Sequence, residues 1–483
     1  MNRAKTLGEL KKSKYQSRSI HEEIRTNLIA KISNNENSFN GIHGYDNSVI
    51  PDVERALLSG HNILFLGLRG QAKTRMARLM TDLLDEYIPV VSGSEINDDP
   101  LNPISKFAKE TILKLGDKTP IHWLHRNDRY VEKLATPDVN VADLLGDIDP
   151  IKAATKKLEF SDEYSIHYGL IPRSNRSVFV INELPDLQNR IQVALFNILE
   201  ENDIQIRGFK LKLPLNILFV FTANPEDYTQ RGNIITPLKD RIQSQILTHY
   251  PESIETALKI TLQEVSIPDA LRKKIYIPFQ LLQVIEQLTF SARDSELVDQ
   301  KSGVSARLSI SALELLYSAI ERRMLLNKEI KSTARLCDLL SIVPAITGKI
   351  ELVYEGEQMG AYEVAMTLIN DAILKIGKSY FPKMDSKKKS APDVFALTTN
   401  WFTKGNDVNV NLSMGDKAYA EAIQSVPIDK KLFMDVKKED ILFMTEFLLH
   451  YIASNNTIQK EWMDQRIFFK DPLAGMLNDL NLQ

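Results

Sequence analysis

Cysteine is almost absent from this chain of 483 residues, in which Cys337 is the only one. A single cysteine excludes an intrachain disulfide and a cysteine-rich metal site, and its simplest role is that of a small buried apolar residue. The chain also lacks a large charge of one sign, since its net charge is −3. Composition therefore gives no electrostatic reason to expect nucleic acid or an anionic membrane as a partner.

Long apolar runs are missing as well. No stretch approaches the roughly 18 consecutive apolar residues that a membrane-spanning helix needs. The N-terminal segment is polar, carries early acidic residues and has no apolar core, which is not the pattern of a secretory signal. We therefore expect a cytoplasmic protein, with a length that leaves room for more than one domain.

One stretch has the order strand, glycine-containing loop and helix. The apolar run 62–66 is followed by GLRGQAKT (67–74), and helix-favouring residues continue from 75 to 86. Such a loop binds phosphate when its backbone N–H groups point inward, a lysine reaches the β- and γ-phosphates, and a hydroxyl ligates Mg²⁺. The candidate binding residues are Gly67, Gly70, Gln71, Ala72, Lys73 and Thr74. An ordinary strand-turn-helix corner is the alternative.

Ala72 departs from this pattern, because glycine is usual directly before the lysine. A methyl group is tolerated at that position only when the backbone angle φ is negative. We therefore expect Ala72 to adopt a negative φ.

Further apolar runs alternate with helical segments and predict a parallel α/β sheet with the phosphate loop at its switch edge. Together with 62–66, the predicted strands are 88–91, 178–181, 217–221 and 245–248. The segment 93–176 is too long for a simple loop in a compact domain, so we expect insertions there.

Polar residues follow two of these runs. Asn182 and Glu183 follow the run 178–181, and Asn224 follows 217–221. In phosphate-loop ATPases an Asp at the first position holds Mg²⁺ and a following Glu orients the attacking water. Glu183 suits the second role, whereas Asn182 offers a neutral carbonyl oxygen in place of a carboxylate. A helix N-cap with an acidic first turn is the alternative for this pair.

The strand signal disappears after residue 250, and the following helical patterns predict a second, helical domain. Ser309 is the expected N-cap of one of its helices. We expect five segments: an N-terminal helical extension (1–40), an α/β nucleotide-binding domain (41–250), a helical domain (251–382), a linker (383–392) and a C-terminal helical region (393–483).

Taken in order, these motifs resemble those of the AAA+ ATPases, within the magnesium-chelatase ATPase-subunit and MoxR-like group. GLRGQAKT resembles the Walker A motif, VFVINE the Walker B motif and FTANPEDY the sensor-1 strand end. PLKDR resembles the arginine-finger segment and GVSARLSI the start of the sensor-2 helix. Segments 141–150 and 203–213 stand where that group has its helix-2 insert and its pre-sensor-1 hairpin.

The resemblance implies an AAA+ sheet with a helical lid, and ATP and Mg²⁺ as cofactors. Lys73 and Thr74 would bind the phosphates and Mg²⁺, with Asn182 beside the ion. Glu183 would polarise the attacking water and Asn224 would position it.

The resemblance also implies roles for two arginines. Arg241 would act across a subunit interface as the finger that neutralises charge on the γ-phosphate, and Arg307 would reach the same nucleotide from the lid. A surface ion pair or a helix cap is the alternative for each arginine.

The expected assembly is a ring, with a hexamer as the expected size. Its function would be to remodel or assemble a protein client, with a von Willebrand factor A domain protein as adaptor and no nucleic acid or membrane partner. One alternative is the motor subunit of a magnesium chelatase. Another, motivated by Asn182 and Ala72, is a nucleotide-sensing scaffold that does not hydrolyse ATP.

Overall fold

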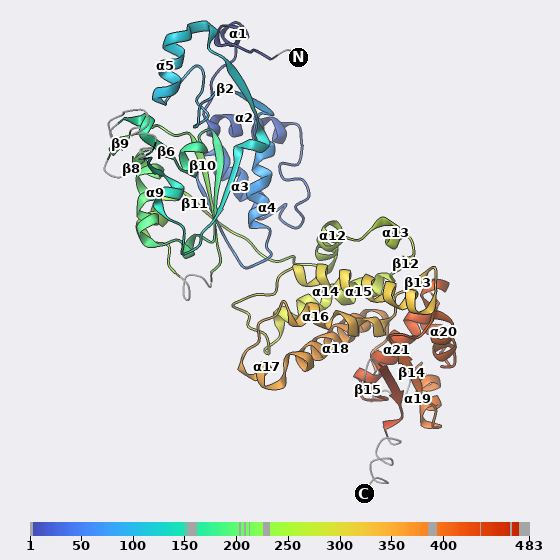
Figure 1. The fold of residues 1–483 in the computed structure, drawn as a ribbon. Coiled ribbons are helices and arrows are strands. Elements are labelled where there is room, and N and C mark those ends of the chain that lie inside the picture. Colours follow the sequence, from blue (N-terminus) through green and yellow to red (C-terminus); the bar gives the residue numbers. More distant parts are fainter. Residues whose placement is uncertain are drawn as a thin grey trace. The chain divides into compact units, whose positions relative to one another are not determined.

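The computed structural model describes residues 3–149, 151, 162–201, 204–206, 209–211, 213–225, 232–384, 394–434, 436–463 and 466–472. The chain divides into two compact units, Met1–Tyr250 and Pro251–Gln483 (Figure 1). Within the described residues, no helix is long and apolar enough to cross a membrane.

The first unit is built on a parallel five-stranded sheet, as the sequence predicts. Its strand order is β11-β1-β10-β7-β4. The strands are β1 (Ile63–Leu66), β4 (Tyr130–Leu134), β7 (Ser177–Asn182), β10 (Ile217–Ala223) and β11 (Ser244–Leu247). Parallel strands need crossover connections, and the helices between them supply these.

Helices cover both faces of this sheet, which makes three layers (Figure 1). Alternate residues of β7 enter different cores: Val178 and Val180 pack in one, Phe179 and Ile181 in the other. The first core is closed by α2 (Ile20–Ser33), α3 (Val49–Leu58) and α4 (Lys73–Leu79), and the second by α9 (Asn189–Glu201) and α11 (Thr236–Arg241).

The prediction that the run 88–91 belongs to the central sheet is wrong. β2 (Tyr87–Val91) pairs antiparallel with β3 (Ile121–His125) in a separate two-stranded sheet. The edge position is taken by β4, which lies inside the segment expected to carry only insertions. As an edge strand β4 leaves its side chains exposed or half-buried, so it lacks the continuous apolar run of a central strand.

Two hairpins accompany the sheet. β5 (Gly146–Ile148) pairs with β6 (Ile166–Tyr168), and β8 (Ile204–Ile206) pairs with β9 (Phe209–Leu211), both antiparallel. The connecting residues 150, 152–161 and 207–208 lie outside the described residues. The other elements of this unit are α1 (Leu7–Lys12), η1 (Met80–Leu83), α5 (Lys106–Leu115), η2 (Gly116–Lys118), η3 (Arg126–Arg129), α6 (Val141–Leu144), η4 (Glu163–Ser165), α8 (Leu170–Arg173) and η5 (Leu184–Asp186).

The second unit is mostly helical, in agreement with the predicted helical C-terminal region (Figure 1). Its helices are α12 (Ile254–Glu264), α13 (Asp269–Arg272), α14 (Phe279–Asp294), α15 (Arg307–Asn327), η6 (Leu336–Ile342), α16 (Val343–Thr347), α17 (Tyr354–Met359), α18 (Ala361–Tyr380), α19 (Ala396–Thr403), α20 (Asp416–Gln424), η7 (Lys430–Phe433), η8 (Lys438–Asp440) and α21 (Ile441–Ser454). One hydrophobic core joins residues of 265–381 with residues of 395–469.

The expectation that strands end at residue 250 is wrong in detail. β12 (Ile275–Tyr276) pairs with β13 (Ser332–Thr333), and a three-stranded antiparallel sheet has the order β14-β16-β15. Its strands are β14 (Val408–Asn411), β15 (Gln459–Met463) and β16 (Arg466–Lys470). Because they have only two to five residues, their alternation is too short to separate strand from helix or loop by pattern.

Ser309 is not a helix cap. The helix α15 begins two residues earlier, after Ala306, and the buried Ser309 hydroxyl contacts Thr289 and Glu286 of α14 at 2.7 and 2.9 Å. The serine therefore joins two packed helices.

A buried ion pair ties the N-terminal helix α2 to the central sheet. The guanidinium of Arg129, just before β4, donates to both carboxylate oxygens of Glu23 at 2.7 Å. The two side chains are 1% and 5% exposed. Glu23 also accepts the backbone N–H of Asp85 at 2.7 Å, so it serves two segments of the first unit.

We expect Glu23→Gln to lower the free energy of unfolding by about 3–5 kcal/mol, because it leaves the Arg129 charge buried without its counter-charge. Urea denaturation followed by circular dichroism measures the change, with the exposed Glu86→Gln as the matched control. If Glu23→Gln lowered the free energy of unfolding no more than the control, the ion pair would not be what ties α2 to the sheet.

Candidate functional site

The site begins where three parallel strands end. Leu66, the last residue of β1, pairs with Ala223, the last residue of β10. The neighbouring strand β7 ends at Asn182. Since the carboxyl ends of parallel strands meet at one edge of a sheet, the loop 67–74, Asn182 and Asn224 come together there.

The loop turns sharply before α4, and the expected negative φ at Ala72 is wrong. Gly70 has a φ of 76° and Ala72 a φ of 57° with a ψ of 17°, which is the left-handed conformation. Helix α4 begins at the next residue, Lys73. The left-handed region costs an L-residue about 1–2 kcal/mol, so the chain accepts local strain to make this turn.

Lys73 points into the loop and toward the end of β10. Its ammonium donates to the carbonyl oxygens of Gly67 and Leu68, the latter at 2.9 Å, and to Oδ1 of Asn224 at 2.7 Å. The structure thus brings the predicted lysine and the predicted sensor-1 residue into direct contact. This position also puts a positive charge where the loop would hold phosphate.

Thr74 and Asn182 form the second contact of the site. The Thr74 hydroxyl donates to Oδ1 of Asn182 at 3.3 Å, and Thr222 Oγ1 donates to the same oxygen at 3.1 Å. Thr222 Oγ1 also accepts the backbone N–H of Glu183 at 3.2 Å. Glu183 itself has a φ of 56°, a strained value of the kind that clusters at functional sites.

Two side chains from outside the loop, Thr248 and Tyr45, donate hydrogen bonds to Gln71 of the loop. Gln71 is buried and accepts a 2.7 Å hydrogen bond from the Thr248 hydroxyl. A side chain at Gly67 would lie only 2.0 Å from that hydroxyl, so this position requires glycine. The Tyr45 hydroxyl donates to the Gln71 carbonyl oxygen at 2.9 Å, and burial raises the pKa of Tyr45 to about 12, which keeps it a donor.

Sequence reasoning missed several residues of this edge: Tyr45, Glu132, Thr222 and Thr248. Thr222 and Thr248 could have been found, because each stands at the carboxyl end of a predicted strand. Glu132 had no such signal, since its strand was not predicted.

Arg241 is held by its own subunit. It ends α11 and pairs with Glu200 of α9, with Nε to Oε2 at 2.7 Å, while its Nη1 donates to the Pro237 carbonyl oxygen at 2.9 Å. The Glu200 side chain is 58% exposed. No hydrogen bond between Arg241 and the phosphate loop occurs in the described part of this subunit.

Arg307 lies in the second unit, at the first turn of α15, and is exposed. Its relation to the phosphate loop stays a prediction. Arg231, a further arginine of the first unit, lies outside the described residues.

The chemistry of this edge fits a nucleotide with Mg²⁺. The Thr74 hydroxyl and the Asn182 amide oxygen are the oxygen ligands that Mg²⁺ prefers, and this ion usually needs few protein groups besides phosphates and water. The Lys73 ammonium, in contact with loop carbonyls, supplies the charge for the phosphates.

Three comparisons bear on family membership. No protein-family model matches the chain. A curated relative, "Magnesium-chelatase subunit ChlI homolog" of Methanocaldococcus jannaschii, is 25% identical over 215 residues, 44% of this chain and 55% of the relative. The chain thus matches about half the length of that relative.

Over these residues the chain is similar to a magnesium-chelatase subunit homolog, which agrees with the resemblance of its motifs to the magnesium-chelatase and MoxR-like group of AAA+ proteins.

Two solved structures are also similar, at low scores. The BchI–BchD complex of magnesium chelatase matches with a TM-score of 0.35 and 17% identity over 67% of this chain and 98% of that one. NtrX from Brucella abortus in complex with ATP matches with a TM-score of 0.38 and 12% identity, over 73% of this chain and 68% of that one. These TM-scores are too low to assign a family.

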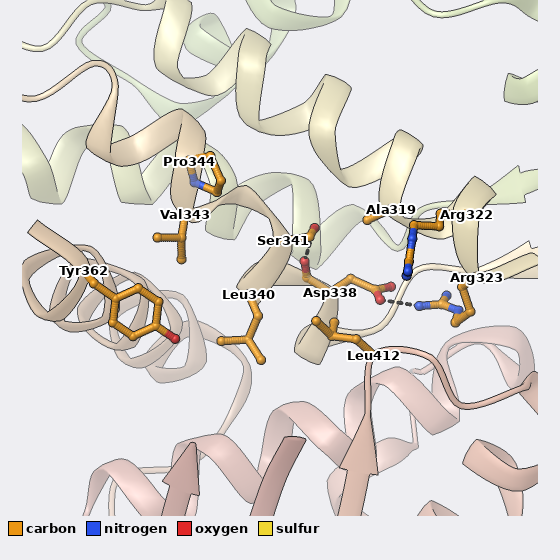
Figure 2. Close-up of a pocket in the computed structure, with 10 residues that line it drawn as sticks. All are labelled: Ala319, Arg322, Arg323, Asp338, Leu340, Ser341, Val343, Pro344, Tyr362 and Leu412. Atoms are coloured by element: carbon orange, nitrogen blue, oxygen red, sulfur yellow. Dashed lines mark hydrogen bonds and ion pairs between the residues drawn. The ribbon is translucent and has the colours of Figure 1, made fainter. Parts of the chain in front are cut away.

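A separate hollow of about 520 Å³ lies in the second unit (Figure 2). Its walls come from α15, η6, α16, α18 and the segment after β14. The buried Arg323 and Asp338 at its side pair with each other, so this buried charge is already compensated. None of the AAA+ motif residues named above lines it.

We expect Ala72→Gly to leave the free energy of unfolding unchanged or to raise it by up to about 1.6 kcal/mol. Glycine removes the left-handed strain of about 1–2 kcal/mol but gives the unfolded chain about 0.4–1 kcal/mol more entropy. Ala72→Val should destabilise, because a β-branched residue is a genuine outlier at this φ. Urea denaturation compares the two variants; a clear loss for Ala72→Gly would show that the site needs the methyl group.

Proposed function

We propose that this AAA+ protein binds ATP with Mg²⁺ and hydrolyses it to ADP and phosphate. One observation carries the proposal: Lys73 contacts Asn224 at 2.7 Å while the adjacent Thr74 contacts Asn182 at 3.3 Å. A phosphate-binding cation, a hydroxyl and the polar ends of two central strands thus converge on one point. An ordinary strand-turn-helix corner has no need of that convergence.

Each residue has a defined task in this reaction. Lys73 donates to the β- and γ-phosphate oxygens, and the loop N–H groups add further donors. Glu183 accepts a hydrogen bond from the attacking water and orients it, while Asn224 positions the same water. Mg²⁺, when bound, neutralises charge on the phosphate oxygens, and Thr74 with Asn182 would hold it.

Arg241 is the proposed finger for a neighbouring subunit in a ring, for which a hexamer is the expected size. Its present partner, Glu200, is mostly exposed, and exposed ion pairs contribute only about 0–1 kcal/mol. Leaving the Glu200 carboxylate therefore costs little, and Arg241 would also give up its hydrogen bond to the Pro237 carbonyl oxygen on turning to a neighbour's γ-phosphate. Arg307 would contact the nucleotide from the lid.

The work of the ring would be to remodel or assemble a protein client in the cytoplasm, with a von Willebrand factor A domain adaptor. The two hairpins, β5–β6 and β8–β9, would contact the client and transmit the movement to it. A chelatase motor subunit is the second candidate, which the similarity to a magnesium-chelatase subunit homolog favours. A scaffold that does not hydrolyse ATP is the third, and the neutral Asn182 favours it.

We expect ATPase activity per subunit to rise with protein concentration, because the active site is complete only between subunits.

Glu183→Gln should assemble with ATP but lose turnover by about 10²–10⁴-fold, as for loss of a general base. Arg241→Ala should lose about 10³–10⁵-fold, and Glu200→Gln, which only frees Arg241, should stay active. Phosphate release and light scattering with and without ATP measure turnover and mass.

Full turnover by assembled Arg241→Ala would show that Arg241 is not the finger. No turnover by the wild type at any concentration, with nucleotide still bound, would favour the scaffold.

A further inference from the structure

A carboxylate from the edge strand β4 stands beside Asn182. Glu132 Oε1 accepts a hydrogen bond from Nδ2 of Asn182 at 2.6 Å. Its other oxygen accepts from the Tyr130 hydroxyl at 2.9 Å and from Arg78 of α4 at 3.0 Å. Both carboxylate oxygens are thus held in place, and the side chain is 27% exposed.

This contact decides which way the Asn182 amide faces. An amide has one end that donates and one that accepts, whereas an ionised carboxylate can only accept. The amide nitrogen must therefore face Glu132, and Oδ1 is left facing the hydroxyls of Thr74 and Thr222. Threonine hydroxyls can donate or accept, so they could not fix this orientation without Glu132.

The same contact explains why an asparagine suits this position. The resemblance leads one to expect an aspartate at the end of β7, but a second carboxylate 2.6 Å from Glu132 would meet a like charge. Asn182 next to Glu132 keeps one negative charge at this edge and places it one strand further out. The guanidinium of Arg78, 3.0 Å from Oε2 of Glu132, offsets part of this charge.

We propose that Glu132 is a positioning residue of the Mg²⁺ site, which orients Oδ1 of Asn182 toward Thr74 and supplies the negative charge that Asn182 lacks. The inference rests on the proposed binding of ATP with Mg²⁺. It predicts that the effect of a substitution at Glu132 on Mg²⁺-dependent binding depends on which residue stands at position 182. The two residues lie on neighbouring strands, β4 and β7, which pair through Leu134 and Asn182.

The test measures the dissociation constant of ATP with Mg²⁺ and with EDTA. Glu132→Gln should weaken binding with Mg²⁺ by roughly 10- to 100-fold, as for loss of a residue that orients a metal ligand. Binding in EDTA should not change. The exposed Glu86→Gln, which removes one negative charge from the same unit, should behave as the wild type.

The decisive variant is the exchange Glu132→Gln with Asn182→Asp, which returns the carboxylate to β7 and gives its neighbour an amide. We expect it to restore Mg²⁺-dependent binding. Asn182→Asp alone should lower the melting temperature without nucleotide, because two carboxylates then face each other, and the exchange should raise it again.

The possible failures are distinct. If ATP binds the wild type equally well with Mg²⁺ and with EDTA, the proposed function is contradicted. If the wild type depends on Mg²⁺ and Glu132→Gln does so equally, Glu132 does not serve the ion. If Glu132→Gln weakens binding but the exchange restores nothing, the charge argument is overturned. Equal melting temperatures for Asn182→Asp and the wild type would also overturn it.

Discussion

The parallel pairing of β1, β10 and β7 is the constraint on which the site depends. Leu66 pairs with Ala223, and Phe221 pairs with Ile181, so the chain leaves all three strands at nearly the same level. The loop with Lys73 and Thr74 follows β1, Asn182 ends β7 and Asn224 follows β10. A shift of register in either pair would separate Lys73 from Asn224 or Thr74 from Asn182, because each contact is a single hydrogen bond between residues from different strand ends.

This edge also concentrates strain and charge. Ala72 and Glu183 both have positive φ values, at the turns that lead out of β1 and β7. The surrounding contacts hold these turns: Tyr45 and Thr248 from behind the loop, and Thr222 beneath Glu183. The neutral Asn182 and the carboxylate of Glu132 form a pair in which the charge lies one strand away from its usual position. Strain and unusual residues thus occur together at the edge proposed to bind phosphate.

The sequence predicted the central architecture because the buried parallel strands β1, β7 and β10 are continuous apolar runs. β11 was also recognised, although it is an edge strand with exposed residues. β4 was not, since an edge strand with half-exposed residues such as Glu132 and Lys133 has no such run. Missing β4 also meant missing Glu132. The positive φ of Ala72 could not be predicted, because the strain is tolerated only through contacts from distant segments. The sequence predicted that Lys73 and Asn224 serve one site, but not that they contact each other. The proposed partner of Arg241 could not be derived from one chain, because it would lie on a second copy.

The central claim is that the loop 67–74 binds the phosphates of ATP through Lys73. Calorimetric titration of the wild type and of Lys73→Ala with ATP and Mg²⁺ tests it most directly, with circular dichroism to establish that both are folded. The account predicts that the wild type binds and that Lys73→Ala loses at least about tenfold in affinity, or about 1.4 kcal/mol. Equal affinity for the two proteins would contradict it.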